Sequence, residues 1–205
     1  PQANQLRNLC PDVGHLVHMA SHIDSLSGHW QNAADANRRA IAVDREYVKL
    51  RGREEFYMIS IVHNHDFNIW ASMFLGQFHE ALQSADEICN LVRDKRHLGD
   101  KWYLGSTLDG YYAGRAHVLV RFGRWQQICD EDMPKKPNSV PITTILLVYA
   151  KAIAHAALGD LESARSYQQE FYKRYNKVPA WHIMANNPTR DILAVAQAMM
   201  NGEVE

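Results

Sequence analysis

The sequence has little excess charge of either sign and no long uninterrupted apolar run. Its 205 residues include 22 Lys and Arg and 23 Asp and Glu, which gives a formal net charge of -1. The broad positive field that attracts nucleic acid or anionic lipid is therefore missing. The longest mostly apolar run, residues 142–158, is interrupted by Lys151 and His155 and falls short of the roughly 20 residues that a membrane span needs. We predict no nucleic-acid partner and no membrane partner. The sequence does not assign a compartment, although a soluble, cytoplasmic protein is favoured.

The sequence is also poor in cysteine and in the motifs of known enzyme classes. Its three cysteines, Cys10, Cys89 and Cys129, lie far apart and form no CxxC pair. This spacing argues against a disulfide framework and against a zinc site made of cysteines. The sequence contains no glycine-rich phosphate loop, no GxSxG motif and no recognisable nucleophile and base. We therefore assign no catalytic residue and favour a protein that is not an enzyme, with a metal-dependent protein as the alternative.

What the sequence does contain is a short pattern that recurs along its length. A glycine is followed two residues later by an aromatic residue or Leu, and three residues further by a small or aliphatic residue, at 28–33, 76–81, 123–128 and 159–164. Glycine can adopt the left-handed turn that ends a helix, and the small residue lets two helices approach closely. A fifth copy is predicted to begin at Gly202. The pattern predicts helix–turn–helix hairpins and an all-α fold.

This pattern resembles that of tetratricopeptide repeats, whose unit is about 34 residues of helix, turn and helix. The resemblance covers nearly the whole chain. It implies a right-handed α-solenoid of antiparallel helix hairpins with longer insertions between the repeats. The division that it implies for residues 1–205 is the tail of a preceding repeat at 1–12, repeats at 14–50, 55–95 and 101–130, a proline-rich link at 131–141, a repeat at 142–176, and the first helix of a truncated repeat at 187–205.

The predicted repeats are irregular and look cut at both ends. Their turn glycines are 48, 47, 36 and 43 residues apart, so the extra residues must form loops or longer helices. Residues 47–54 and 94–100 are predicted insertions, and residues 130–141, with three prolines, are a predicted non-helical link. Because both ends fall inside a repeat, we expect the rest of a longer chain to be missing.

The resemblance also assigns residues to a concave groove. In tetratricopeptide proteins the first helix of each hairpin lines this groove through residues at fixed places. Carried over to this chain, the groove candidates are His15, His18, His22, His63, Asn64, Asp66, Trp70, His117 and Tyr149. Helical geometry agrees for the first three, because residues i, i+3 and i+7 share one face. The resemblance implies a scaffold that binds a peptide or protein segment in the groove.

The 11 histidines support a second hypothesis, a metal site. His18 and His22, at positions i and i+4, can bind one divalent ion from a single helix, and His63 can complete the site from the next. Zn, Cu, Fe and Ni are the candidate ions, and the further candidate ligands are His15, His65 and Asp66. The alternative is that these histidines are half-buried hydrogen-bonding residues. Ser21 lies between His18 and His22 in the sequence, and its side chain is predicted to point away from both.

A narrower resemblance concerns the stretches that carry these histidines. Residues 15–23, 63–67 and 118–125 are similar to large histidine-rich bacterial tetratricopeptide proteins of mostly unassigned activity. Those proteins usually have proline where this chain has Ala20 and Val62, so the kink that the resemblance implies has no proline here. They also carry further histidine-rich repeats upstream, which is where additional ligands are expected.

Overall fold

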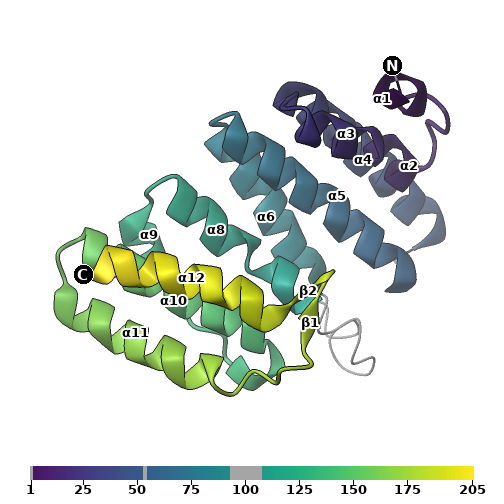
Figure 1. The fold of residues 1–205 in the computed structure, drawn as a ribbon. Helices are drawn as coiled ribbons and strands as arrows, with labels where there is room; N and C mark the ends of the chain where they lie inside the picture. The colour runs from purple at the N-terminus through teal and green to yellow at the C-terminus, as the bar shows by residue number, and fades with distance from the viewer. Residues whose placement is uncertain (1, 53–54, 93–107) are drawn as a thin grey trace. The chain divides into compact units, whose positions relative to one another are not determined.

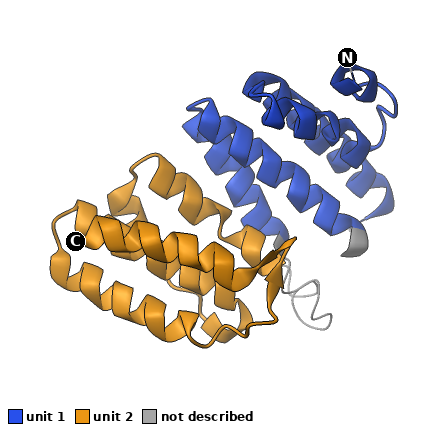
Figure 2. Ribbon diagram, viewed as in Figure 1, with its two compact units in different colours: residues 1–97 blue, residues 98–205 orange. Residues whose placement is uncertain are grey.

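The chain is predominantly helical (Figure 1). The computed structural model describes residues 2–52, 55–92 and 108–205. Within these ranges the strands are one short antiparallel pair, β1 (Ile183–Met184) and β2 (Asn187–Pro188). The predicted all-α class is therefore confirmed. The chain divides into two compact units, residues 1–97 and residues 98–205, which Figure 2 shows in different colours.

Unit 1 is a set of helices packed around α4 and α5. Its helices are α1 (Gln2–Leu6), α2 (Gly14–His18), α3 (Ala20–Leu26), α4 (Trp30–Arg51), α5 (Glu55–Phe74) and α6 (Phe78–Val92). α4 packs against α2, α3 and α5, and α5 also packs against α2 and α6. α2 and α3 are separated by Met19 alone. The helix is thus interrupted next to Ala20, although no proline stands there.

Unit 2 is organised around α10. Its helices include α8 (Gly114–Arg121), α9 (Trp125–Asp130), α10 (Pro141–Ala157), α11 (Leu161–Tyr175) and α12 (Thr189–Val204), with a 3-10 helix η1 (Pro137–Ser139) before α10. α10 packs against α8, α9, α11 and α12. Its first turn is capped by the buried Asp109, whose carboxylate accepts the N–H groups of Ile142 and Thr143. The apolar run at residues 142–158 thus lies mostly in a helix, α10, with many buried side chains. None of the described helices has the length and apolar character to cross a membrane.

Four glycines of the recurring pattern end their helices in the same way. The φ angles of Gly28, Gly76, Gly123 and Gly159 are 75°, 71°, 63° and 81°. In each case the residue after the glycine donates its N–H to the carbonyl five residues back, as His29 does to Asp24 at 2.8 Å. This pair of features defines the Schellman motif, which satisfies the last carbonyls of a helix. The predicted left-handed helix ends are confirmed at all four positions.

The small or aliphatic residue of the pattern lies in the core beside each turn. Ala33, Ala81, Ile128 and Ala164 are all 0% exposed. Such complete burial is expected where two helices of a hairpin approach each other closely. At the first turn the aromatic residue is also a packing residue, because Trp30 stacks on Phe74 with ring centroids 4.0 Å apart.

The predicted fifth turn at Gly202 is wrong. Helix α12 starts at Thr189, inside the segment 187–205 predicted to hold a helix, but runs through Gly202 to Val204. Gly202 does not have the positive φ of the four turn glycines. The buried stripe of α12 continues to Val204, which is 4% exposed, so burial of this side chain holds the helix together past the glycine.

The described part of the predicted insertion at residues 47–54 is mostly a lengthened helix, one of the two forms expected for the extra residues. Residues 47–51 belong to α4, which has 22 residues and ends before Gly52 at a φ of 77°. The extra length between the first two turns is therefore helix in this part. The predicted insertion at residues 94–100 lies outside the described residues. The predicted link is confirmed as non-helical over residues 131–136, with η1 following it.

Candidate metal centre

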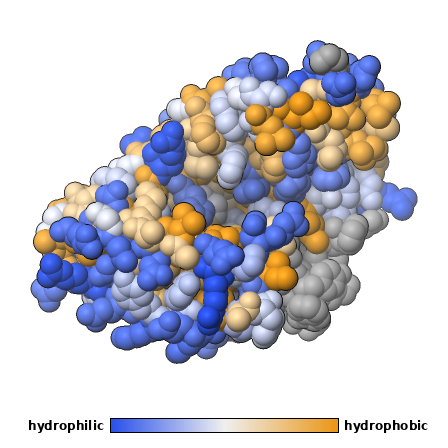
Figure 3. Space-filling view, in the orientation of Figure 1, coloured by the Kyte–Doolittle hydropathy of each residue, from blue (hydrophilic) through white to orange (hydrophobic). Residues whose placement is uncertain are grey.

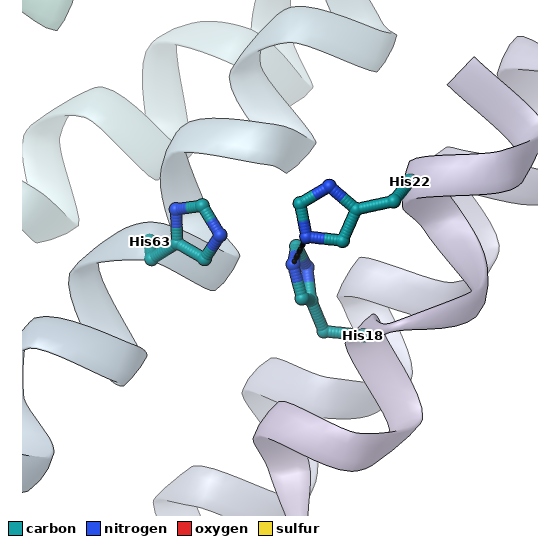
Figure 4. A group of neighbouring side chains, drawn as sticks. All are labelled: His18, His22 and His63. Atoms are coloured by element: carbon teal, nitrogen blue, oxygen red, sulfur yellow. Dashed lines mark hydrogen bonds between the residues drawn. The ribbon is translucent and has the colours of Figure 1, made fainter. Parts of the chain in front are cut away.

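Three histidines from α2, α3 and α5 converge in unit 1. Figure 4 shows that the rings of His18 on α2 and His22 on α3 face the ring of His63 on α5. One ring nitrogen from each lies within 4.8 Å of the others. The ring centroids are 4.6 Å apart for His18 and His22, 4.7 Å for His18 and His63, and 5.7 Å for His22 and His63. We call these three residues the histidine trio.

These separations match the requirements of a shared ion. With metal–nitrogen distances of about 2.0 Å, each ring centroid lies about 3.2 Å from the ion, so tetrahedral ligands have centroids about 5.2 Å apart. The three separations in the trio lie on both sides of this value. Ligand nitrogens at about 2.0 Å from a tetrahedral ion lie about 3.3 Å apart, so the three nitrogens, now within 4.8 Å of one another, must move closer to share one ion.

The approach of α2 to α4 positions the trio. Gly14 begins α2, and a Cβ atom added there would lie 1.9 Å from Oδ1 of Asp44 and 2.9 Å from the carbonyl oxygen of Ala40. Only glycine fits this contact without displacing α2 from α4. One turn further along α2, His18 is fully buried and faces α5. The absence of a side chain at Gly14 thus fixes the depth of the first ligand.

A buried amide fixes the tautomer of His18. Nδ2 of Asn37 donates to the carbonyl oxygen of Ala33 at 2.8 Å, so Oδ1 of Asn37 is the acceptor for Nδ1 of His18 at 2.7 Å. Neutral His18 therefore carries its proton on Nδ1 and has a lone pair on Nε2. Nε2 lies 2.9 Å from Nε2 of His22, inside the trio. This is the way an outer hydrogen bond prepares a metal-binding imidazole.

The prediction that Ser21 points away from both neighbouring histidines is wrong for His18. Oγ of Ser21 lies 3.3 Å from Nδ1 of His18, and Ser21 is fully buried. Residues three apart share one face across this helical segment, which explains the contact. Ser21 therefore lies on the side of the ring that faces Asn37, away from the lone pair on Nε2.

Burial keeps the trio neutral near pH 7. Loss of hydration lowers the pKa of His18 to about 3, although the Asn37 hydrogen bond opposes this shift. Burial lowers the pKa of His63 to about 4, with His22 and His15 as further causes, and it also lowers the pKa of His22. Because a metal ion binds the unprotonated ring nitrogen, these shifts keep the ligands available.

The sequence analysis missed Asn37 and Phe67. The ring of Phe67 lies 4.7 Å from His18, 4.5 Å from His22 and 4.8 Å from His63, so it forms an apolar wall against the trio. Asn37 does carry a signal in the sequence, because it is a polar residue in a stripe of buried alanines, between Ala36 and Ala40. Phe67 carries a weaker one, its position one turn after His63.

Two of the other predicted residues on α5 do not join the trio. Nδ2 of the buried Asn64 donates to Asp44 at 2.7 Å. Nε2 of the buried His65 lies 3.5 Å from a carboxylate oxygen of Glu87. Burial lowers the pKa of His65 to about 4 despite this carboxylate. Both side chains therefore serve contacts between α5 and its neighbours α4 and α6.

The remaining candidates have different environments. Asp66 is half-buried on α5 and contributes no oxygen to the converging group. Trp70, one turn further along α5, is 54% exposed. In unit 2, His117 is exposed on α8, whereas Tyr149 is buried on α10 and its hydroxyl lies 3.0 Å from the sulfur of Met199. His15 lies beside the trio, stacked on His18.

The fold and the site define a predominantly helical chain with a histidine trio in which His18 is buried and His22 and His63 are half-buried. No protein-family model, curated protein or solved structure matches this chain. What can be said of its function therefore comes from its own residues.

Proposed function

We propose that the chain binds a divalent transition-metal ion through His18, His22 and His63. The observation that carries the proposal is the convergence of one nitrogen from each side chain within 4.8 Å. Neutral imidazoles are ligands that suit Zn, Cu, Ni and Fe. The hydrogen bond from His18 to Asn37 supports the same reading, because it directs the lone pair of Nε2 into the trio.

The framework of this site, in our proposal, is a tetratricopeptide-type array of helix hairpins. Four helix ends with the same Schellman geometry support it, as do the fully buried small or aliphatic residues that follow them. Within unit 1, each of α4, α5 and α6 packs against its neighbour in sequence, as stacked hairpins require. In such an array the metal would join the first helices of two successive hairpins.

Metal analysis tests the proposal directly. After incubation with Zn²⁺ and dialysis, the wild-type protein is expected to retain about one ion per chain, the content of a site with three or four protein ligands. His18→Ala and His22→Ala each remove one ligand and are expected to retain less than about a tenth of an ion. The measurement is inductively coupled plasma mass spectrometry, followed by calorimetric titration.

His29→Ala is the matched control. His29 is exposed and lies at the turn between α3 and α4, outside the trio, so its replacement should leave the zinc content unchanged. Circular dichroism of the metal-free variants checks that the helices remain. A wild-type protein that retains no zinc, copper, nickel or iron at neutral pH would falsify the proposal.

Peptide binding is a second proposal, favoured by exposed apolar side chains on unit 1. Trp70 and Phe74, on the last turns of α5, are each 54% exposed, and Leu26 on α3 is 91% exposed. Figure 3 shows apolar surface over the part of unit 1 that contains α3. Exposed aromatic residues of this kind anchor many protein interfaces.

Selection from a phage-displayed peptide library tests this second proposal. Peptides that bind the wild-type protein are expected to bind Trp70→Ala about 10-fold more weakly. A tryptophan that a bound peptide covers typically contributes a large share of the affinity. Trp181→Ala, which removes an exposed tryptophan of unit 2, is the control. Failure to enrich any peptide, or equal affinity for Trp70→Ala, would exclude this surface as a peptide site.

A further inference from the structure

We infer that His15 is the fourth ligand of the metal site, so that four imidazoles enclose the ion and leave no position for a ligand from solution. This inference rests on the proposed function. A fourth histidine ligand would also change the role of the metal site, because zinc sites closed by four protein ligands are structural, whereas catalytic sites keep one position open.

The position of the His15 ring supports this assignment. Its centroid lies 5.4 Å from that of His18 and 5.9 Å from that of His63. These values are close to the separation of about 5.2 Å expected for imidazoles that share one ion. The ring is nearly parallel to His18, at 14°, so it must turn about its side-chain bonds and move toward His22 to present a nitrogen.

An unused ring nitrogen supports it as well. Nδ1 of His15 is buried and has no hydrogen-bond partner in the described structure. A buried polar atom without a partner is costly, so such an atom in a native protein needs an explanation. The nitrogens of His18 differ, because its Nδ1 already pairs with Asn37. A metal ion next to His15 would give this orphaned nitrogen its partner.

The surroundings of His15 suit a ligand. The buried carboxylate of Asp44 interacts electrostatically with His15. Asp44 is itself held by the hydroxyl of Tyr57 at 2.6 Å and by Nδ2 of Asn64 at 2.7 Å. A fixed carboxylate near a metal-binding imidazole favours the bound cation electrostatically. Asn64 thus contributes to the site from behind, without facing the ion.

The other two candidates for the fourth ligand fit less well. His65 is engaged with Glu87, on the side of α5 that packs against α6. Asp66, like His15 itself, contributes no atom to the converging group. The ring of His15 contacts two of the three members of the trio, whereas the ring contacts of the trio in the described structure do not include His65. Among the candidates in the described part of the chain, His15 is the side chain nearest to completing the tetrahedron.

Cobalt substitution tests whether the site is closed. Co²⁺ is the probe, since its visible absorption bands report the number and kind of ligands, and azide is the competing ligand from solution. With His15 bound, the bands of wild-type protein should not change at azide concentrations that occupy an open site. His15→Ala and His15→Gln are expected to bind Co²⁺ more weakly, by about 10-fold or more, and their bands should shift with azide. His29→Ala should behave as wild type.

The possible results distinguish failure of the His15 assignment from failure of the proposed metal binding. If Co²⁺ binds and the wild-type bands shift with azide, the fourth position is open and His15 is not a ligand, while the three-histidine site stands. If His15→Ala and His15→Gln bind Co²⁺ as tightly as wild type, the assignment is likewise overturned. If the protein binds neither Co²⁺ nor any of zinc, copper, nickel and iron, the metal-binding function itself is wrong. The azide measurement on wild-type protein needs no variant, so a misfolded substitution cannot obscure the outcome.

Discussion

Gly14→Ala is expected to destabilise the protein by about 3 kcal/mol, at the upper end of what overpacking of a core usually costs. The added Cβ would lie 1.9 Å from a carboxylate oxygen of Asp44 and 2.9 Å from the backbone oxygen of Ala40. The carboxylate cannot simply swing aside, because Tyr57 and Asn64 hold it through hydrogen bonds. Urea unfolding followed by circular dichroism measures the loss.

The opposite result is expected for the glycine near the end of the chain. Gly202 lies inside α12, does not have a positive φ, and has no atom within 4 Å of an added Cβ. Gly202→Ala should therefore stabilise the protein by about 0.5 to 1 kcal/mol, the ordinary difference between these residues within a helix. Equal effects of the two substitutions would show that the close contact of α2 with α4 is wrong.

Acidification of the metal-free protein is expected to reduce its free energy of unfolding by about 3 kcal/mol between pH 7 and pH 4, from His18 alone. The pKa of His18 is about 3 in the folded protein and 6.5 in an unfolded chain. As the pH falls below 6.5, the unfolded chain binds a proton that the folded protein does not. This contribution to stability is therefore complete above pH 6.5 and is lost as the pH falls toward 3.

Urea unfolding in the presence of a chelator, at pH 7, 5.5 and 4, measures this loss. His18→Leu removes the titrating group from the buried site, so the difference between pH 7 and pH 4 should shrink by about 3 kcal/mol. His29→Gln, at an exposed position, should leave the pH dependence unchanged. A wild-type protein and a His18→Leu variant with the same pH dependence would show that His18 is not buried as a neutral imidazole.

The helix ends could be predicted from the sequence where glycine has one physical role. At Gly28, Gly76, Gly123 and Gly159 the left-handed backbone and the buried residue five positions later were both predictable. Gly202 shows the limit of such reasoning, because the same residue type is tolerated within a helix when the stripe beyond it is buried. Whether Val204 is buried depends on tertiary packing, which local sequence does not reveal.

The histidine trio could be predicted in part because helical spacing is simple geometry. His18 and His22 share a face because they are four residues apart. His63 was assigned to the same surface because it occupies an equivalent place in the next predicted repeat. The roles of Asn64 and His65 could not be read in this way. α5 packs against α2, α4 and α6, so most of its faces meet a neighbour and polarity alone does not say which one.

The partners behind the ligands were less predictable still. Asn37 holds His18 across 19 residues of sequence, and Asp44 belongs to the same α4. Contacts of this kind depend on the depth at which α2 sits on α4, which the missing side chain of Gly14 sets. The sequence indicated which residues could bind a metal, and the packing of α4 decides which of their nitrogens are free to do so.

Because the helix is broken at Met19, the α2–α3 segment that carries His18 and His22 depends more on tertiary packing than the other parts of the site. α2 has 5 residues and α3 has 7, and helices this short do not persist in water without tertiary support. α5, with 20 residues, has no such weakness. An ion shared by the two sides would couple a segment prone to local opening to a stable one. Amide hydrogen exchange across residues 14–26 would then slow with metal occupancy, and the chain would report metal availability through its own local order.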